Sequence, residues 1–141
     1  MKENFLIKIV GTQLSEGEKN SIELTTRGSF VRRGESYYIS YRETAATGYE
    51  GCTTTVKLDG AGRVSMLRFG KAPSELIIDP TQRHICHYDT GHGSITMGIA
   101  ADEIIADLDE TGGELEFSYD LDVNCNVFSR NKVKISVREV Q

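Results

Sequence analysis

The sequence has little proline, no Cys-x-x-Cys pair and no long hydrophobic run, and each of these shortages excludes some classes of structure. Two prolines stand against 14 glycines, a composition that favours short strands joined by tight turns. The first apolar run, residues 5–10, is short and is interrupted by Lys8. It is too short for a signal peptide or a membrane-spanning helix, so we expect neither a targeting segment nor a membrane partner.

A surplus of positive charge is also missing, since 16 Lys and Arg residues stand against 21 Asp and Glu and give a formal net charge of -5. Proteins that bind nucleic acids draw much of their affinity from neutralising phosphates, so DNA and RNA are not expected partners. Cys52, Cys86 and Cys125 are odd in number and far apart. We interpret them as reduced thiols of a cytoplasmic protein.

Alternation of apolar and polar residues is what the chain has in abundance. Residues 52–58 and 63–70 alternate on either side of the turn at 59–62, and residues 114–122 alternate with a return run at 132–138. An Asp-Gly turn between two alternating runs is a strong hairpin signal. A period of two gives each strand one buried and one wet face. Further strands are expected over residues 5–14, 19–32, 36–44, 74–79, 83–90 and 94–100.

Residues 100–110 fit two structures. Ile104, Ile105 and Leu108 could line one side of a short helix, or Ile104, Ala106 and Leu108 could face inward from a strand. We favour a strand because the neighbouring segments are strands. No crossover helix then remains for a parallel sheet.

About ten sequential strands in 141 residues, without a linker or repeat, predict one all-β domain over residues 1–141. Such strands either close into a barrel or split into a sandwich. Closure removes exposed sheet edges. We therefore expect a closed antiparallel up-and-down barrel of eight to ten strands, of the lipocalin or calycin kind.

Several short segments stand in a characteristic order along the chain. They are Gly11-Thr12-Gln13, Thr25-Thr26 with Gly28, Tyr41-Arg42-Glu43-Thr44, Gly51 with Thr53 to Thr55, Arg68-Phe69-Gly70, Tyr88-Asp89-Thr90 with Gly91 and Gly93, Tyr119, and Ser129 to Asn131. In their order and spacing they resemble the YwiB-like calycin-barrel family of bacterial domains of unknown function. The resemblance spans nearly the whole chain and implies a lipocalin-type barrel. It brings no established activity and no catalytic residues.

Tyr41 and Glu43 are the most informative polar residues. They share the more apolar face of their strand with Tyr37 and Ile39, so they should point into the barrel. A buried carboxylate without a partner is costly, so it either takes up a proton or finds a cation. Arg68 is the partner that we expect, pointing inward from its own strand.

Two interpretations of this group stay open. It is either a structural ion pair, completed by tyrosine hydroxyls, or the polar anchor of a ligand cavity. In the second case arginine would hold a carboxylate or phosphate of the ligand. The candidate ligand-binding residues, all of which stand in the segments quoted for the family, are Tyr41, Glu43, Arg68, Tyr88, Thr90 and Tyr119.

A metal site is not expected, although His84, Cys86, His87, Asp89 and His92 have the right chemistry. Alternation sends the first two side chains to one face of the strand and the next two to the other, whereas zinc needs three or four ligands together.

The nine acidic residues between positions 102 and 122, with no Lys or Arg among them, lack an EF-hand loop. We interpret them as a solvated strand face rather than a calcium site.

No Gly-x-Ser-x-Gly elbow or other catalytic motif is present, so no catalytic residue and no cofactor is assigned. Our preferred hypothesis is a cytoplasmic barrel that binds a small, anionic molecule inside or at its mouth. One alternative is an interaction module with a plugged barrel that forms a homodimer. Another is an enzyme acting on a small anionic substrate, with Glu43 as base and Arg68 as anchor.

Overall fold

The alternating segments form one antiparallel sheet. The computed structural model describes residues 4–45, 49–71, 73–89, 94–123 and 126–140. The strands within this part are β1 (Phe5–Ser15), β2 (Glu18–Arg33), β3 (Ser36–Arg42), β4 (Thr53–Leu58), β5 (Val64–Phe69), β6 (Ser74–Ile78), β7 (His84–Asp89), β8 (Ser94–Asp109), β9 (Gly112–Val123) and β10 (Asn126–Glu139). Their order is β6-β5-β4-β3-β2-β1-β10-β9-β8-β7. Every strand pairs with the next strand in the chain except at the β6–β7 step, and β1 also pairs with β10, which confirms the predicted up-and-down topology.

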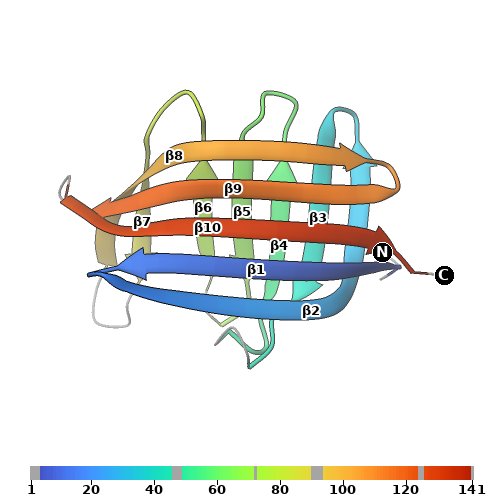
Figure 1. Ribbon diagram of the computed structural model, residues 1–141, viewed down its shortest axis with the longest axis horizontal. Coiled ribbons are helices and arrows are strands. Elements are labelled where there is room, and N and C mark those ends of the chain that lie inside the picture. The colour runs from blue at the N-terminus through green and yellow to red at the C-terminus, as the bar shows by residue number, and fades with distance from the viewer. Residues whose placement is uncertain (1–3, 46–48, 72, 90–93, 124–125, 141) are drawn as a thin grey trace.

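The sheet curls into two layers whose strands cross one another (Figure 1). In the view shown, β1, β10 and β9 run horizontally in the front layer, and β3 to β6 run vertically behind them. The strands β2 and β8, of 16 residues each, belong to both layers. Residues 18–28 of β2 pair with β1 and residues 28–33 pair with β3. Likewise, residues 94–99 of β8 pair with β7 and residues 98–109 pair with β9.

The first corner lies at Gly28, which pairs with both Phe5 of β1 and Tyr41 of β3. A Cβ atom at this position would lie 2.3 Å from the Ser40 carbonyl oxygen and 2.4 Å from Ile7 Cδ1. No side chain fits at such distances without moving the backbone of β3. Glycine is therefore required here by the close approach of the two strands.

The second corner lies at Gly98, which pairs with both Ile85 of β7 and Asp122 of β9. The guanidinium of Arg83 covers this glycine, and three of its atoms would lie 2.2 to 2.4 Å from an added Cβ. Arg83 Nε and Nη2 donate to the two Asp122 carboxylate oxygens at 2.9 and 2.5 Å. This two-pronged ion pair joins the start of β7 to β9 across the bend in β8.

The barrel is nearly closed, because β6 and β7 lie next to each other without a full ladder of hydrogen bonds. An isolated bridge between Asp79 and Gln82 joins them. The Asp79 carboxylate accepts hydrogen bonds from the Thr81 hydroxyl at 2.7 Å and the Thr81 N–H at 2.9 Å, and its other oxygen lies 3.0 Å from His84 Nε2. The hydrogen bonds from Thr81, together with His84, hold the pKa of Asp79 well below its usual range.

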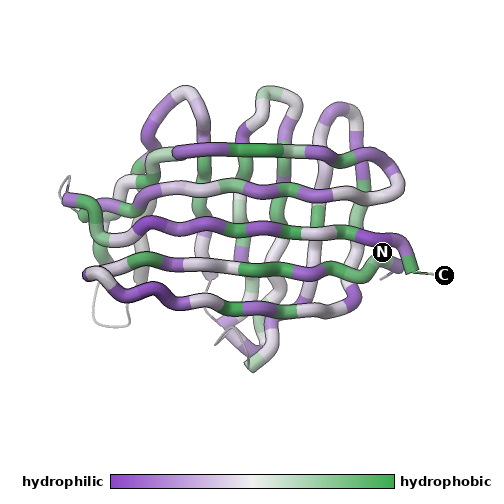
Figure 2. Tube along the Cα trace, in the orientation of Figure 1, coloured by the Kyte–Doolittle hydropathy of each residue, from purple (hydrophilic) through white to green (hydrophobic). Residues whose placement is uncertain are grey.

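The inner face of the curled sheet forms a continuous apolar core. Hydropathy alternates along the strands, as expected for a barrel with one face inside (Figure 2). The buried members of this core are Ile7, Leu24, Phe30, Ile39, Tyr41, Val56, Leu58, Val64, Ile78, Ile99, Leu115, Phe117, Tyr119, Val133, Ile135 and Val137. No helix in the described part of the chain has the length and apolar character to cross a membrane.

Residues 100–109 are strand and residue 110 begins the following turn, so the helical alternative is wrong. They continue the segment 94–100, and the two form the single strand β8 with a change of register between Ala101 and Glu103. Ile104 and Leu108 pack against the core, whereas Ile105 lies on the outer face and is half exposed. The register change explains why the two halves looked like separate strands in the sequence.

The acidic residues of β9 face basic residues of β10 on the outside of the front layer. Lys132 Nζ lies 3.2 Å from Glu116 Oε1, and Lys134 Nζ lies 3.9 Å from Glu114 Oε2. These exposed pairs each contribute little stability. They indicate that part of the acidic face is matched across strands rather than gathered around an ion.

The corner at Gly28 predicts a large difference between two Gly→Ala substitutions. Gly28→Ala forces a methyl group into the Ser40 carbonyl and should destabilise the fold by about 2–3 kcal/mol. Gly11→Ala in β1 is the control, because nothing lies within 4 Å of its Cβ position. It should be neutral or slightly stabilising. Urea unfolding followed by circular dichroism measures both, and equal midpoints would contradict the assigned role of Gly28.

Candidate functional site

A row of polar side chains crosses the inner face of the rear layer near one end. Tyr41 of β3, Thr54 of β4, Arg68 of β5 and Ser74 of β6 are consecutive cross-strand partners. Because partners in register share a face, all four project to the inner side. Tyr41 and Thr54 are buried, and the other two are partly buried. We call these four residues the polar row.

Glu43 joins the polar row just beyond the end of β3 and is 8% exposed. Its backbone N–H donates to the Cys52 carbonyl at 2.9 Å, which extends the pairing of β3 and keeps the alternation of side chains. Thr54 Oγ1 donates to Glu43 Oε1 at 3.2 Å, and the Tyr41 hydroxyl also hydrogen-bonds this carboxylate. The predicted inward orientation of Tyr41 and Glu43 is therefore confirmed.

The protonation of Tyr41 follows from this environment. Burial raises the pKa of Tyr41 far above its ordinary value of 10.0, and the charge of Glu43 and the hydrogen bond to its carboxylate raise that pKa further. The charge of Arg68 and a hydrogen bond with Thr54 act in the opposite direction and do not outweigh the first three effects. Tyr41 is thus a fixed neutral donor to a buried carboxylate, not a base.

Arg68 points inward as predicted, but its contacts differ from those expected. No ion pair joins it to Glu43 among the described contacts. Its Cζ atom lies 3.5 Å from the centroid of the Tyr49 ring, and its Nη1 donates to Ser74 Oγ at 3.3 Å. Its Nε atom is buried and has no hydrogen-bond partner among the residues that the structure describes. The Glu43 carboxylate instead accepts hydrogen bonds from Tyr41 and Thr54, and these two residues precede Arg68 in the polar row.

The other candidate residues do not belong to the polar row. Tyr119 is buried on β9 in the front layer, with its ring stacked on Phe117 at a centroid distance of 6.2 Å. Tyr88 lies within β7, but its side chain is outside what the structure describes, and Thr90 is outside the described residues altogether. Of the six residues chosen from the sequence, Tyr41, Glu43 and Arg68 are thus the ones brought together.

Among the possible metal ligands predicted around residue 84, the side chain of His84 is described, and its role is structural. His84 lies against Asp79 at the junction of β6 and β7. Among the described residues, no three His, Cys, Asp or Glu side chains are grouped so that they could hold a metal ion. Cys52 is a buried free thiol.

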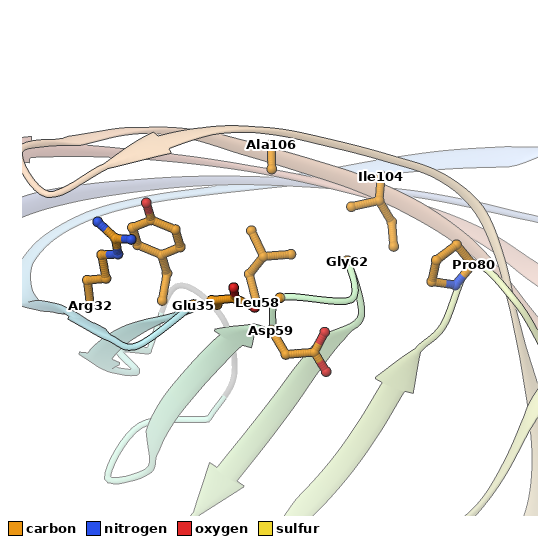
Figure 3. Close-up of a pocket in the computed structure, with 10 residues that line it drawn as sticks. Arg32, Glu35, Leu58, Asp59, Gly62, Pro80, Ile104 and Ala106 are labelled. Carbon is orange, nitrogen blue, oxygen red and sulfur yellow. The ribbon is translucent and has the colours of Figure 1, made fainter.

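A cleft of about 560 Å³ opens at the opposite end of the β4–β5 hairpin, between the two layers. In Figure 3, Ile104 and Ala106 project into it from β8, and Leu58, Gly62 and Pro80 lie on the facing side. The cleft is lined by Arg32, Glu35, Tyr37, Leu58, Asp59, Gly60, Gly62, Pro80, Ile104 and Ala106. We call it the mouth cleft. Sequence reasoning missed it, and the small inward-facing Ala106 was the signal available.

The floor of the mouth cleft is fixed by aromatic packing. Phe30 stacks on Tyr37 at a centroid distance of 5.7 Å and meets Phe5 edge-on at 5.3 Å. These contacts link the corner of β2 to the cleft. Arg32 lies beside the same floor, with its Cζ 5.9 Å from the Tyr37 ring centroid. The result is a rigid apolar surface with a cation at its edge.

The charged groups at the rim differ in how firmly they are held. Asp59 accepts hydrogen bonds from the N–H groups of Ala61 and Arg63 and from Arg63 Nε. Burial raises the pKa of Asp59, but these hydrogen bonds outweigh it and leave the pKa below its usual value. Arg32, by contrast, pairs with the exposed Glu110 at 3.2 Å. Such a pair is readily exchanged for another anion.

The raised pKa of Tyr41 predicts a pH-dependent effect of Tyr41→Phe. At pH 7 the variant removes the Tyr41 donor to the buried Glu43 carboxylate and should lose about 1–3 kcal/mol of stability. As pH rises above 10, the unfolded wild-type chain releases its phenolic proton before the folded protein does. The advantage of the wild type therefore shrinks at alkaline pH. Urea unfolding of both proteins from pH 7 to about 11 measures this difference, and a constant difference would contradict it.

Comparisons with known proteins agree with this architecture. The crystal structure of the ywiB protein from Bacillus subtilis matches with a TM-score of 0.77 and 20% sequence identity, over 94% of this chain and 89% of that chain. At this identity the likeness shows the fold alone. No curated protein matches the sequence. The family model described as a domain of unknown function (DUF1934) matches residues 7–135. Since this match covers most of the sequence, the chain belongs to the DUF1934 family.

Proposed function

We propose that this protein binds a small, mainly apolar molecule with one anionic group at the mouth of the barrel, without catalysis. The observation that carries the proposal is the mouth cleft, whose volume of about 560 Å³ lies in the range typical of small-ligand pockets. Its floor is apolar, and its rim carries the Arg32 guanidinium beside the carboxylates of Glu35 and Asp59. The apolar floor and the guanidinium are the features that would bind an amphiphilic anion.

The position of the cleft favours the mouth over the barrel interior. Below it, the inner face of the sheet is a continuous core in which Ile39, Val56 and Val64 are almost fully buried. At the mouth, Ala106 leaves room that a larger side chain on β8 would fill. A ligand would therefore rest on the end of the packed core, under β8.

Arg32 is the cation among the residues that line the cleft, beside the carboxylates of Glu35 and Asp59. Asp59 is occupied by its own turn, whereas Arg32 is exposed, donates from Nε to the Gly34 carbonyl and pairs through Nη1 with the exposed Glu110. Replacing Glu110 by a ligand anion costs little, because an exposed ion pair contributes about 0–1 kcal/mol. A carboxylate, sulfonate or phosphate on the ligand would thus sit at Arg32 while its apolar body covers the floor.

Filling the cleft should abolish binding. The probe is 8-anilinonaphthalene-1-sulfonate, which has aromatic rings and one sulfonate, followed by its fluorescence during titration. Ala106→Phe should weaken its affinity by at least about tenfold. Ile105→Phe is the matched control, because the adjacent side chain lies on the outer face of β8, and it should bind the probe like the wild type. Identical titrations of all three proteins would refute the site.

The anionic part of the proposal has its own measurement. Arg32→Gln should weaken the sulfonate probe by about threefold, in line with an exposed ion pair. It should leave the uncharged probe N-phenyl-1-naphthylamine unaffected. Equal losses for both probes would retain the cleft but reject the preference for an anion.

A further inference from the structure

We propose that Arg68 forms a second binding site, for the oxyanion of a small carboxylate or phosphate, at the end of the barrel opposite the mouth cleft. The site consists of the Arg68 guanidinium, the Tyr49 ring that covers it and the Ser74 hydroxyl beside it. It is separate from the mouth cleft, since Arg68 lies at the far end of the β4–β5 hairpin from the turn at 59–62.

The guanidinium is held in place before any ligand arrives. The Tyr49 ring centroid lies 3.5 Å from Cζ, and Ser74 Oγ accepts from Nη1 at 3.3 Å. Tyr49 is itself fixed, because its carbonyl accepts a hydrogen bond from the Cys52 N–H at 3.0 Å. A cation held on an aromatic ring loses little further freedom on binding, which favours affinity.

One donor of this guanidinium is unused. Nε is buried and donates to no acceptor among the described residues, whereas more than about 90% of buried polar groups in proteins are hydrogen-bonded. In arginine, the Nε–H and one Nη–H are parallel donors that match two oxygens of a carboxylate or phosphate. Since Nη1 is taken by Ser74, the remaining pair is Nε with Nη2.

The same protein shows what fits this edge. In Arg83 the Nε and Nη2 donors are both used, by the two carboxylate oxygens of Asp122 at 2.9 and 2.5 Å. Arg68 has the same pair of donors in a partly buried position but no carboxylate against it among the described residues. Glu43 does not fill this role, because its carboxylate is bound by Thr54 and Tyr41.

Nuclear magnetic resonance of the arginine Nε–Hε groups tests the site directly. Inorganic phosphate and acetate are titrated separately into the full-length protein that carries Ala106→Phe, so that the mouth cleft is blocked. We expect the Arg68 Hε signal to shift and saturate with at least one of the two anions. The Arg83 Hε signal should not move, because Asp122 already occupies its donors. Saturation by phosphate only or by acetate only identifies which oxyanion the edge accepts.

Two variants test whether the anion is bound by the parallel N–H donors of Arg68 or by its positive charge alone. Arg68→Lys keeps the positive charge but loses the parallel donors, and it should bind about tenfold more weakly. Arg68→Gln should not bind. Because neither variant has an Arg68 Hε group, binding to both is followed by the backbone N–H signals of Tyr49 and Ser74. The unchanged signals of Arg83 in both variants show that the fold is intact. An Arg68 signal that moves with neither anion overturns the proposal. The proposal is also overturned if the Arg68 signal shifts linearly with anion concentration, without saturation, and together with the signal of the exposed Arg63. Such behaviour indicates nonspecific screening by salt.

Discussion

The structure depends on two places where a single strand leaves one layer and enters the other. A flat sheet of ten strands would expose both faces and both edges, so the sheet must turn over on itself. It does so within β2 and β8, and each turn takes place at a residue that pairs with strands on both sides. At Gly28 the two neighbouring strands come so close that the backbone of Ser40 occupies the space of a side chain. At Gly98 the guanidinium of Arg83 fills that space and is fixed by Asp122. The first corner is thus possible because Gly28 has no side chain. At the second corner, the ion pair between Arg83 and Asp122 occupies the space that a side chain at Gly98 would need.

The corners also determine where the two candidate sites lie. Because Gly28 pairs with Tyr41, the bend in β2 sets the register of β3 and, through it, the row that leads to Arg68. The bend in β8 carries Ile104 and Ala106 across the ends of the rear strands, where they form the roof of the mouth cleft. A shift of one residue at either corner would turn these side chains to the outer face. The two sites are therefore consequences of how the layers join.

Much of this arrangement could be predicted from alternation along the chain. Side chains two apart share a face, which correctly placed Tyr41, Glu43 and Arg68 on the inside and assigned residues 100–110 to a strand. Alternation gives the face of a strand but not the strands that oppose it across the barrel. The mouth cleft combines residues from β2, β3, β4, β8 and three connections, and no local pattern links them. The partner of Glu43 was missed for a related reason. Charge suggested Arg68, but the neighbouring hydroxyls of Tyr41 and Thr54 already satisfy the carboxylate, and hydroxyls give no charge signal in a sequence.

Arg68 and Arg83 differ in the partners of their guanidinium groups, and this difference bears on the function of the polar row. A buried donor without an acceptor costs about 1–3 kcal/mol, and the simplest structural remedy is a carboxylate such as the one that Asp122 offers to Arg83. Glu43 lies on the same inner face as Arg68, yet it is held by two hydroxyl donors rather than by the guanidinium. If the row served stability alone, pairing the two charges would satisfy both groups at once. The observed division leaves the arginine oriented by Tyr49 and Ser74 while its Nε donor stays unused by the described residues. Such an arrangement sacrifices stability at this position, and binding of an oxyanion would recover it, so occupancy of this end of the barrel and stability of the fold should be linked.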